Sequence, residues 1–525
     1  MMKLVIDNIV LRPGRPEGEI GEEIGRRLGI PAPGGYEIIR KSLDARKKSD
    51  IVYRYRVVID LADEIARPLI EAGEAAPYEK KTHPTLAVRR PDLSVLVVGT
   101  GPSGLFCALR LIEAGARVEL LERGKPIEER MKDIEILESS GELNEQSNVL
   151  FGEGGAGTYS DGKLTTRTHR PEIDQVFRTL VEHGAPSSIL YEAKPHLGTD
   201  RLRGIVRSIR GAIHASGSNI SFNETLDDII VHDGAVAGVI TGTGREITVE
   251  RVVLAIGHSA RDTYEMLLKR GVTMEKKGFA AGIRIEHPAA LINRIQYGNS
   301  PYRDLLPAAE YALTFNDRMS GRGIYSFCMC PGGRVINSSS EREMLCTNGM
   351  SFSRRNQPFS NAAIVVSVSP EDCPGGPLDG ISFQRMIESS AFRSGGGLYH
   401  APAQRVTSFL AGRLDTDLPE VSYRPGVVPA RLDRALPSWI VDAMKKALPA
   451  FDNAMKGYIT DQAVFIGAET RTSSPVRIAR DSGFQSVSVR GLYPAGEGAG
   501  YAGGIASSAV DGIRCAEQIL CGARR

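Results

Sequence analysis

One glycine-rich turn constrains this chain more than any other feature of its sequence. The apolar run Val95–Val98 leads into Gly99-Thr100-Gly101-Pro102-Ser103-Gly104, and a helical pattern over Leu105–Ala114 follows. A second apolar run, Val118–Leu121, ends in Glu122, close to the roughly 20-residue spacing at which a carboxylate holds a ribose hydroxyl. This order of strand, glycine turn, helix, strand and acidic residue predicts a dinucleotide-binding unit whose helix N-terminus carries a diphosphate.

Each glycine of this turn has a physical reason. Gly99 permits the tight turn, Gly101 lets the backbone approach a pyrophosphate, and Gly104 lets the helix pack closely on the sheet. The nucleotide contacts expected in this part of the chain are Gly99, Gly101, Pro102, Ser103, Gly104, Glu122 and Arg123.

The composition agrees with a large folded protein. The chain has 525 residues, of which 57 are glycine, 42% are hydrophobic and 24% are charged, which excludes intrinsic disorder. A net charge of +2 gives no general reason to expect nucleic acid or a membrane as partner. The N-terminus does not resemble a secretion signal, and the seven cysteines show no regular spacing. We therefore expect a soluble, cytoplasmic protein, whose oligomeric state stays open.

The hydrophobic patterns divide the chain into three parts. Residues 1–75 predict a small α+β domain, and 76–92 predict a linker that contains several prolines. Residues 93–275 predict the first part of the nucleotide-binding domain, 276–462 an inserted substrate domain, and 463–525 the C-terminal return. The expected fold class is therefore α/β, with a Rossmann-type nucleotide domain, an inserted α+β domain and a small N-terminal α+β domain.

Three further segments carry glycines in places where they would weaken a regular strand or helix. Phe151–Lys163 predicts backbone shaped to lie against a ligand, and Val252–Gly257 predicts a buried strand that ends in a glycine turn. Gly491–Ile505 runs from a strand into a C-terminal helix.

In this order the segments resemble the two-dinucleotide-fold flavoproteins of the glutathione reductase structural class. The chain is closely similar to a bacterial family of FAD-dependent dehydrogenases, or NAD(P)/FAD-dependent oxidoreductases, of unknown substrate. The residues that carry this resemblance are Gly99–Gly104 with Glu122, Phe151–Leu164, Val253–Gly257, Phe327–Gly333, Glu469–Pro475 and Tyr493–Ile505.

The resemblance implies that the dinucleotide is FAD. It places Gly257 near the adenosine half, and Gly496 with Glu497 near the pyrophosphate and the ribityl chain. The last helix would face the flavin's pyrimidine edge, where its dipole stabilises negative charge on the reduced ring. The further FAD contacts expected are Gly154, Gly155, Gly157, Lys163, Gly503, Gly504 and Ile505.

Flavin supplies hydride chemistry, so the sequence must provide a route for electrons. Gly242-Thr243-Gly244 lacks the third glycine of a nicotinamide fingerprint, so NAD(P)H, if it is the reductant, must dock transiently against the flavin. The sequence has no cysteine between Cys107 and Cys328, which excludes disulfide oxidoreductases whose cysteine pair follows the first dinucleotide unit.

Two cysteines are weak candidates for catalysis. Ile324–Cys330 and Arg334–Ser338 predict two strands around a Pro331-Gly332-Gly333 turn, so Cys328 and Cys330 would point to one face. They could be a redox pair, a nucleophile or ligands of a soft metal, but packing near the cofactor is the simpler interpretation. Two cysteines alone do not complete a metal site, so no metal is expected.

Arg471 is a further weak candidate. It lies in the polar segment Glu469–Pro475 shortly before the last glycine segment, where it could fix a substrate carboxylate or support the flavin.

These observations favour an FAD-dependent oxidoreductase that transfers hydride to or from a small organic substrate. One alternative is an RNA-directed flavoprotein, and another is a flavin-binding protein without turnover. The near-neutral charge argues against nucleic acid as a partner. The basic N-terminal residues on which the RNA alternative depends are Arg40, Lys41, Arg46, Lys47, Lys48, Arg54 and Arg56.

Overall fold

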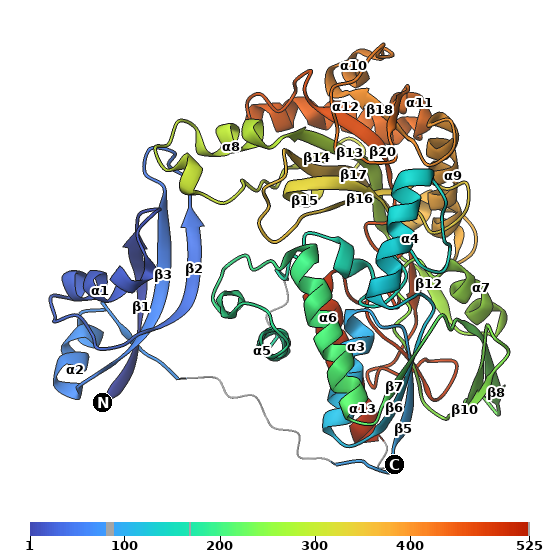
Figure 1. Ribbon diagram of the computed structural model, residues 1–525, viewed down its shortest axis with the longest axis horizontal. Helices are drawn as coiled ribbons and strands as arrows, with labels where there is room; N and C mark the ends of the chain where they lie inside the picture. The colour runs from blue at the N-terminus through green and yellow to red at the C-terminus, as the bar shows by residue number, and fades with distance from the viewer. Residues whose placement is uncertain (80–88, 167–169, 523–525) are drawn as a thin grey trace.

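The N-terminal part is an antiparallel sheet covered on one face by two helices (Figure 1). This computed structural model describes residues 1–79, 89–166 and 170–522. The strand order is β2–β3–β1–β4, and Ile20, Ile24 and Ala66 pack against the inner face of the sheet. The elements are β1 (Met2–Leu11), α1 (Ile20–Leu28), β2 (Glu37–Asp44), β3 (Val52–Leu61), α2 (Asp63–Glu71) and β4 (Ala76–Pro77).

Strand β2 attaches this part to the rest of the molecule. The Lys41 amide donates to the Tyr191 carbonyl at 2.7 Å, and the Ala193 amide donates to the Lys41 carbonyl at 2.8 Å. Ala76–Pro77, the start of the predicted linker, instead pair with β1, and residues 80–88 of that linker lie outside the described residues.

A parallel sheet forms the centre of the second part. Its strand order is β22–β11–β5–β6–β7, and each neighbouring pair is parallel, which confirms the predicted α/β class. The strands are β5 (Ser94–Val98), β6 (Arg117–Glu122), β7 (Asn219–Phe222), β11 (Val252–Leu254) and β22 (Leu492–Pro494).

Helices cover one face of this sheet, and a small antiparallel sheet with one helix covers the other (Figure 1). The first layer is α3 (Pro102–Glu113), α5 (Glu172–Glu182), α6 (Gly198–Ala215) and α13 (Ile505–Gly522). The second layer is β8 (Leu226–His232), β9 (Ala235–Thr241), β10 (Glu246–Thr248) and α7 (Arg261–Lys269). Helix α4 (Ile127–Ser140) and the pair β12 (Met274–Lys276) and β21 (Val476–Ile478) complete this part. No helix in the described residues is long and apolar enough to cross a membrane.

The third part is a large, mostly antiparallel sheet with helices packed on one face (Figure 1). Ile283 and Ile285 on the central strand face these helices, so Arg284 between them faces the opposite side. The strands are β13 (Phe279–Pro288), β14 (Thr314–Asp317), β15 (Arg322–Asn337), β16 (Thr347–Met350), β17 (Phe359–Val368), β18 (Ala401–Arg405), β19 (Val427–Pro429) and β20 (Val464–Glu469). The helices are α8 (Ala289–Tyr297), α9 (Asp379–Ser394), α10 (Val406–Ala411), α11 (Leu432–Ala435) and α12 (Ser438–Ala454).

The return of the chain to the second part begins later than predicted. Strand β20 pairs with β13 and therefore belongs to the sheet of the third part. The predicted boundary at residue 463 precedes this strand, because an apolar run does not reveal which sheet it joins.

A buried cluster of charges joins the second and third parts. The Glu388 carboxylate on α9 accepts hydrogen bonds at 2.8 and 2.9 Å from Arg261 on α7, and at the same two distances from Arg471. Burial raises the pKa of Glu388, but the two guanidiniums lower it more, so its pKa lies well below the usual range. Removal of this carboxylate would leave two buried cations without their shared counter-ion.

We expect Glu388→Gln to lower the free energy of unfolding by about 3–5 kcal/mol at neutral pH. Because the pKa of Glu388 is depressed in the folded state, its contribution is complete above the unfolded value of about 4.3 and is lost progressively as the pH falls below it. Urea unfolding of both proteins at neutral and acid pH should therefore show a difference that shrinks in acid.

The control is Glu265→Gln, which removes the partly exposed partner of Arg385. This change should cost less than about 1 kcal/mol, as for other exposed ion pairs. Similar losses in the two variants would contradict the assignment of the Glu388 cluster as the stabilising junction.

Candidate functional site

Segments that the sequence marks with glycines meet at the first turn of α3. A Cβ on Gly155 would lie 3.0 Å from the Gly101 Cα. A Cβ on Gly496 would lie 2.7 Å from the Ser103 Cβ. The second and the last glycine segments therefore approach the predicted nucleotide turn so closely that a side chain on Gly155 or Gly496 would collide with it.

The third glycine segment completes this arrangement. A Cβ on Gly498 would lie 2.6 Å from the Gly257 carbonyl oxygen, so the segment after β11 packs against the one before α13. No other described atom lies within 4 Å of the Cβ positions of Gly257, Gly503 or Gly504. Three of the predicted contact residues thus border open space, as contacts of a flat ligand should.

The first turn of α3 offers unsatisfied donors to an anion. Its N-cap residue, Gly101, supplies no side-chain cap, and the amides of a first helical turn have no partners within the helix. The Ser103 hydroxyl is buried and has no hydrogen-bond partner among the described residues. Diphosphate oxygens would satisfy these donors, so the residues present fit the pyrophosphate of FAD.

The carboxylate of Glu122, which is predicted to hold a ribose hydroxyl, already accepts four hydrogen bonds within the chain. Its two carboxylate oxygens accept hydrogen bonds from the backbone amides of Thr100 at 2.9 Å, and Gly124 and Gly152 at 3.0 Å. The Thr100 hydroxyl is a fourth donor, at 2.7 Å. Glu122 therefore holds the nucleotide turn against the second glycine segment. Its contact with a ribose stays a prediction and would require one of these bonds to exchange.

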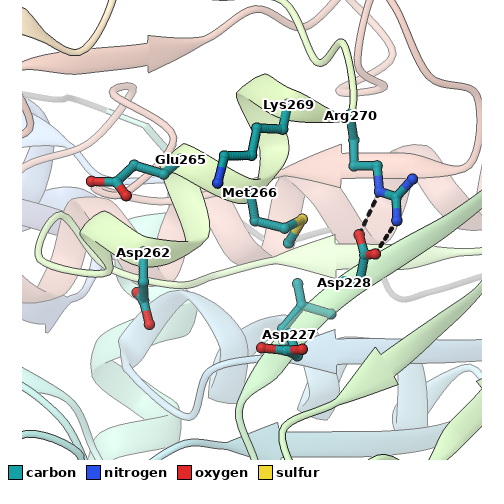
Figure 2. A pocket seen from close by; sticks show the side chains of 8 residues that line it. Asp227, Asp228, Asp262, Glu265, Met266, Lys269 and Arg270 are labelled. Atoms are coloured by element: carbon teal, nitrogen blue, oxygen red, sulfur yellow. Dashed lines mark hydrogen bonds and ion pairs between the residues drawn. The ribbon is translucent and has the colours of Figure 1, made fainter.

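Arg123 packs between Phe151 and α7. Its guanidinium lies 4.3 Å from the Phe151 ring centre and 2.9 Å from the Asp262 carboxylate. Asp262 also lines a surface hollow of about 460 Å³ between α7 and β8, in which Asp228 pairs with Arg270 (Figure 2). This hollow contains none of the glycine segments, so it lies outside the candidate site.

Arg130 on α4 is a structural residue that sequence reasoning missed. Its guanidinium is fully buried and donates to the carbonyls of Asn148 at 2.8 Å, Val149 at 2.8 Å and Glu153 at 2.7 Å. Burial lowers the pKa of Arg130 to about 10. This one side chain fixes the backbone that leads into the second glycine segment. A single arginine in a charged helical segment gives no sequence signal for such a role.

Lys163 connects the second glycine segment to the sheet of the third part. It lies 2.9 Å from the Asp161 carboxylate, and its ammonium donates to the Met329 carbonyl of β15. Burial lowers the pKa of Lys163, but Asp161 and the nearby cysteines raise it more, so it stays protonated at neutral pH. Asp161 also accepts a hydrogen bond at 2.9 Å from Arg355 of the third part.

A second layer of buried polar groups lies on the sheet behind Lys163. Arg284 pairs with Glu469 at 2.7 Å, donates to Asn361 at 2.8 Å and donates to the Cys328 carbonyl at 3.2 Å. The sequence does not predict the pairing of Arg284 with Glu469, because the two residues are far apart in the chain.

The predicted hairpin around Pro331-Gly332-Gly333 is wrong. Residues Arg322–Asn337 form the single strand β15, which has two irregularities in its pairing with β17. A Cβ on Gly332 would lie 1.8 Å from the Arg355 carbonyl oxygen, and one on Gly333 would lie 2.3 Å from that of Met350. The two glycines therefore allow neighbouring backbone to approach closely, which the sequence pattern does not distinguish from a turn.

The two cysteines of β15 differ in their surroundings. Cys328 is partly exposed, whereas Cys330 is fully buried. A hydrogen bond from Cys330 lowers the pKa of the Cys328 thiol to about 7, although burial raises it. The charges of Arg284 and Lys163 also lower this pKa. The pKa of Cys330 is raised well above its usual value by Cys328 and by burial.

The pKa of Glu497 is also shifted. Burial raises its pKa to about 7, the Gly504 amide and Lys277 lower it, and Cys328 raises it further. The last glycine segment and the bulged strand β15 are thus close enough for their ionisable groups to interact.

Arg471 uses three of its five N–H donors within the chain. Its guanidinium forms two hydrogen bonds with Glu388, and it donates to the Ser340 hydroxyl at 2.6 Å. Only 7% of the residue is exposed. These contacts place Arg471 in the junction between the second and third parts, and its role in fixing a substrate carboxylate or supporting the flavin stays a prediction.

Two protein-family models match the chain. One, described as "FAD-dependent protein, C-terminal domain-like", matches residues 278–472, and a "Domain of unknown function (DUF8436)" matches residues 2–60. An uncharacterized protein of Clostridium beijerinckii is 45% identical over 502 residues, which is 92% of this chain and 92% of the relative. A thiamine thiazole synthase of Aeropyrum pernix is 33% identical over 200 residues, 35% of this chain and 61% of the relative.

Solved structures show a looser likeness. The glycerol-3-phosphate dehydrogenase of Bacillus halodurans, complexed with FAD, has a TM-score of 0.36 at 13% identity, covering 82% of this chain and 65% of that one. The glycine oxidase of Bacillus cereus has a TM-score of 0.32 at 13% identity, covering 82% and 96%.

We expect Gly101→Ala to weaken FAD binding about tenfold or more without destabilising the protein. Gly101 has φ −71° and ψ −179°, which alanine adopts, and its Cβ would meet only the Gly155 Cα, at 3.9 Å. The new methyl group would instead occupy space beside the α3 N-terminus, and tenfold corresponds to a loss of about 1.4 kcal/mol. Titration of the apoprotein with FAD measures the affinity.

Gly204→Ala is the matched control, since Gly204 lies exposed on α6 with no other described atom within 4 Å of its Cβ position. Neither variant should lower the thermal midpoint of the apoprotein, and Gly204→Ala should raise it slightly, because alanine favours the interior of a helix more than glycine. Equal FAD affinity in the two variants would place the pyrophosphate away from Gly101.

Proposed function

We propose that this chain, of which residues 278–472 match the family model of FAD-dependent proteins, is an oxidoreductase that exchanges hydride between FAD and a small organic substrate. The observation that carries this proposal is the contact at Lys163. Lys163, at the end of the second glycine segment, contacts the Met329 carbonyl of β15. Arg284 on the sheet of the third part donates to the neighbouring Cys328 carbonyl.

The chain's own residues would hold the cofactor at both ends. The first turn of α3 would bind the diphosphate through its free amides and the Ser103 hydroxyl. Arg130 would keep the second glycine segment in the shape that lies over this turn. The positive end of α13 would stabilise negative charge on the flavin's pyrimidine edge. Bound FAD supplies two-electron hydride chemistry at this place.

The groups between the flavin site and the substrate sheet would orient the substrate. Lys163 would present a positive charge, because Asp161 beside it keeps it protonated. Glu497 would hold or release a proton close to neutral pH, since burial raises its pKa to about 7. A small organic molecule with a polar or anionic group suits this combination.

We further propose that NAD(P)H, where it is the reductant, docks transiently. Among the sheets of the described residues, only the one that contains β5 is built of five parallel strands. A second nucleotide-binding sheet for a resident nicotinamide is therefore not part of the described chain.

The RNA-directed alternative gains no support from the N-terminal part. Arg54 and Arg46 pair with Asp44, and Lys41 pairs with Glu17. These cations are paired within the chain, with Arg46 and Arg54 sharing one carboxylate, whereas phosphate binding depends on cations available to the ligand.

The test is anaerobic reduction of the purified protein. We expect it to carry a flavin absorbance, to release FAD on denaturation, and to lose the absorbance on addition of NADH, NADPH or one member of a metabolite panel. Gly101→Ala provides the control, since it should bleach only in proportion to the FAD it retains. Protein that binds no FAD would refute the proposal, and bound FAD that no donor reduces would favour a flavin-binding protein without turnover.

A further inference from the structure

We propose that Cys328 and Cys330 form a redox pair, in which the two thiols become a disulfide as they give two electrons to the flavin. The pair would link the flavin to thiol or disulfide compounds as a substrate class. This inference rests on the proposed FAD function. Its support comes from the backbone, the burial and the neighbouring charges of β15.

The backbone of β15 is irregular at these two residues. Between Phe327 and Cys330 the strand contains one residue more than the facing segment of β17, as in a β-bulge. Cys328 has φ +44°, a left-handed conformation that is uncommon for any residue other than glycine. Such conformations concentrate at functional sites, because the surrounding structure must hold them in place.

The Cys330 side chain turns back toward Cys328 at the bulge. The Cys330 thiol donates to the Cys328 carbonyl oxygen at 3.3 Å, so the Cys330 side chain folds back toward the preceding cysteine. Cys328 is partly exposed and Cys330 has no exposed surface. This is the arrangement of an accessible attacking thiol and a protected resolving thiol.

Two cations lie beside the bulge. The Lys163 ammonium donates to the carbonyl of Met329, the residue between the cysteines, and Arg284 donates to the carbonyl of Cys328 at 3.2 Å. Positive charge and the Cys330 hydrogen bond favour the Cys328 thiolate and lower its pKa to about 7. A thiolate is the form of cysteine that attacks sulfur or transfers electrons.

Asn361 provides a separate indication that this place is built for a ligand or a changing charge. It lies opposite Cys330 in the pairing of β15 with β17 and has no exposed surface. Its Nδ2 atom has no hydrogen-bond partner among the described residues, although its Oδ1 atom accepts from Arg284 at 2.8 Å. Buried donors normally have partners, and an unused one suits a sulfur atom whose charge changes.

The proposed step balances in atoms and electrons. The Cys328 thiolate and the Cys330 thiol form one S–S bond, and the S–H bond of Cys330 breaks. Oxidised flavin takes both electrons and the proton of Cys330, so the product is the anionic reduced flavin. An external disulfide or thiol exchanging with the pair at the exposed Cys328 would close the cycle.

The test is an anaerobic titration of the holoprotein with dithionite, after one round of full reduction and reoxidation in air. We expect uptake of about four electrons per bound flavin, because the flavin and a disulfide each take two. Cys328→Ser and Cys330→Ser should each lower the uptake to about two. Cys521→Ser is the control, since Cys521 is exposed near the end of α13, and its uptake should stay at about four.

A second measurement uses the unchanged protein and does not depend on the folding of a variant. The tryptic peptide of residues 323–334 contains both cysteines. After reoxidation, denaturation and alkylation, we expect it without alkyl groups and two hydrogens lighter than the reduced peptide. A doubly alkylated peptide, or uptake of only about two electrons by FAD-loaded protein, would overturn the redox pair. Protein without FAD would instead refute the proposed function.

Discussion

The close approach of backbone around the first turn of α3 is the constraint on which the rest of the structure depends. A Cβ on Gly104 would lie 1.9 Å from the Gly99 carbonyl oxygen, and one on Gly512 would lie 2.0 Å from that of Ser103. Strand, turn and C-terminal helix therefore interlock without side chains between them. Since α13 packs against α3, the residues between must leave this unit and return, so the large sheet of the third part is inserted between two parts of it.

Much of this unit could be predicted because its signals are local. A glycine turn after a short apolar run is visible within about ten residues, and β5, α3 and β6 appear where that pattern predicts them. The same local reasoning fails where glycine has a second use. Gly332 and Gly333 suggest a turn, but they lie within β15 where other backbone approaches too closely for a Cβ.

The residues that sequence reasoning missed have partners far away in the chain. Arg130 serves carbonyls of a later loop, and Arg284 meets Glu469 across two strands that are distant in sequence. Arg471, a candidate for substrate binding, forms a buried ion pair with Glu388. The residue type alone cannot separate these roles, because an arginine that binds a substrate and an arginine that joins two domains look the same in a sequence. Their burial and pairing distinguish them.

The electrostatics of the site restrict what its chemistry can do. Cys328 and Glu497 both have a pKa of about 7, and negative charge on Cys328 raises the pKa of Glu497. The two groups therefore compete for ionisation at neutral pH. The pKa of Lys163 is held high by Asp161 beside it, so the lysine offsets one negative charge here but not two. An anionic reduced flavin at this place would add a further negative charge, and uptake of a proton by Glu497 is the response that these pKa values allow. Under the proposed function, electron transfer at this place would therefore be coupled to proton uptake by Glu497.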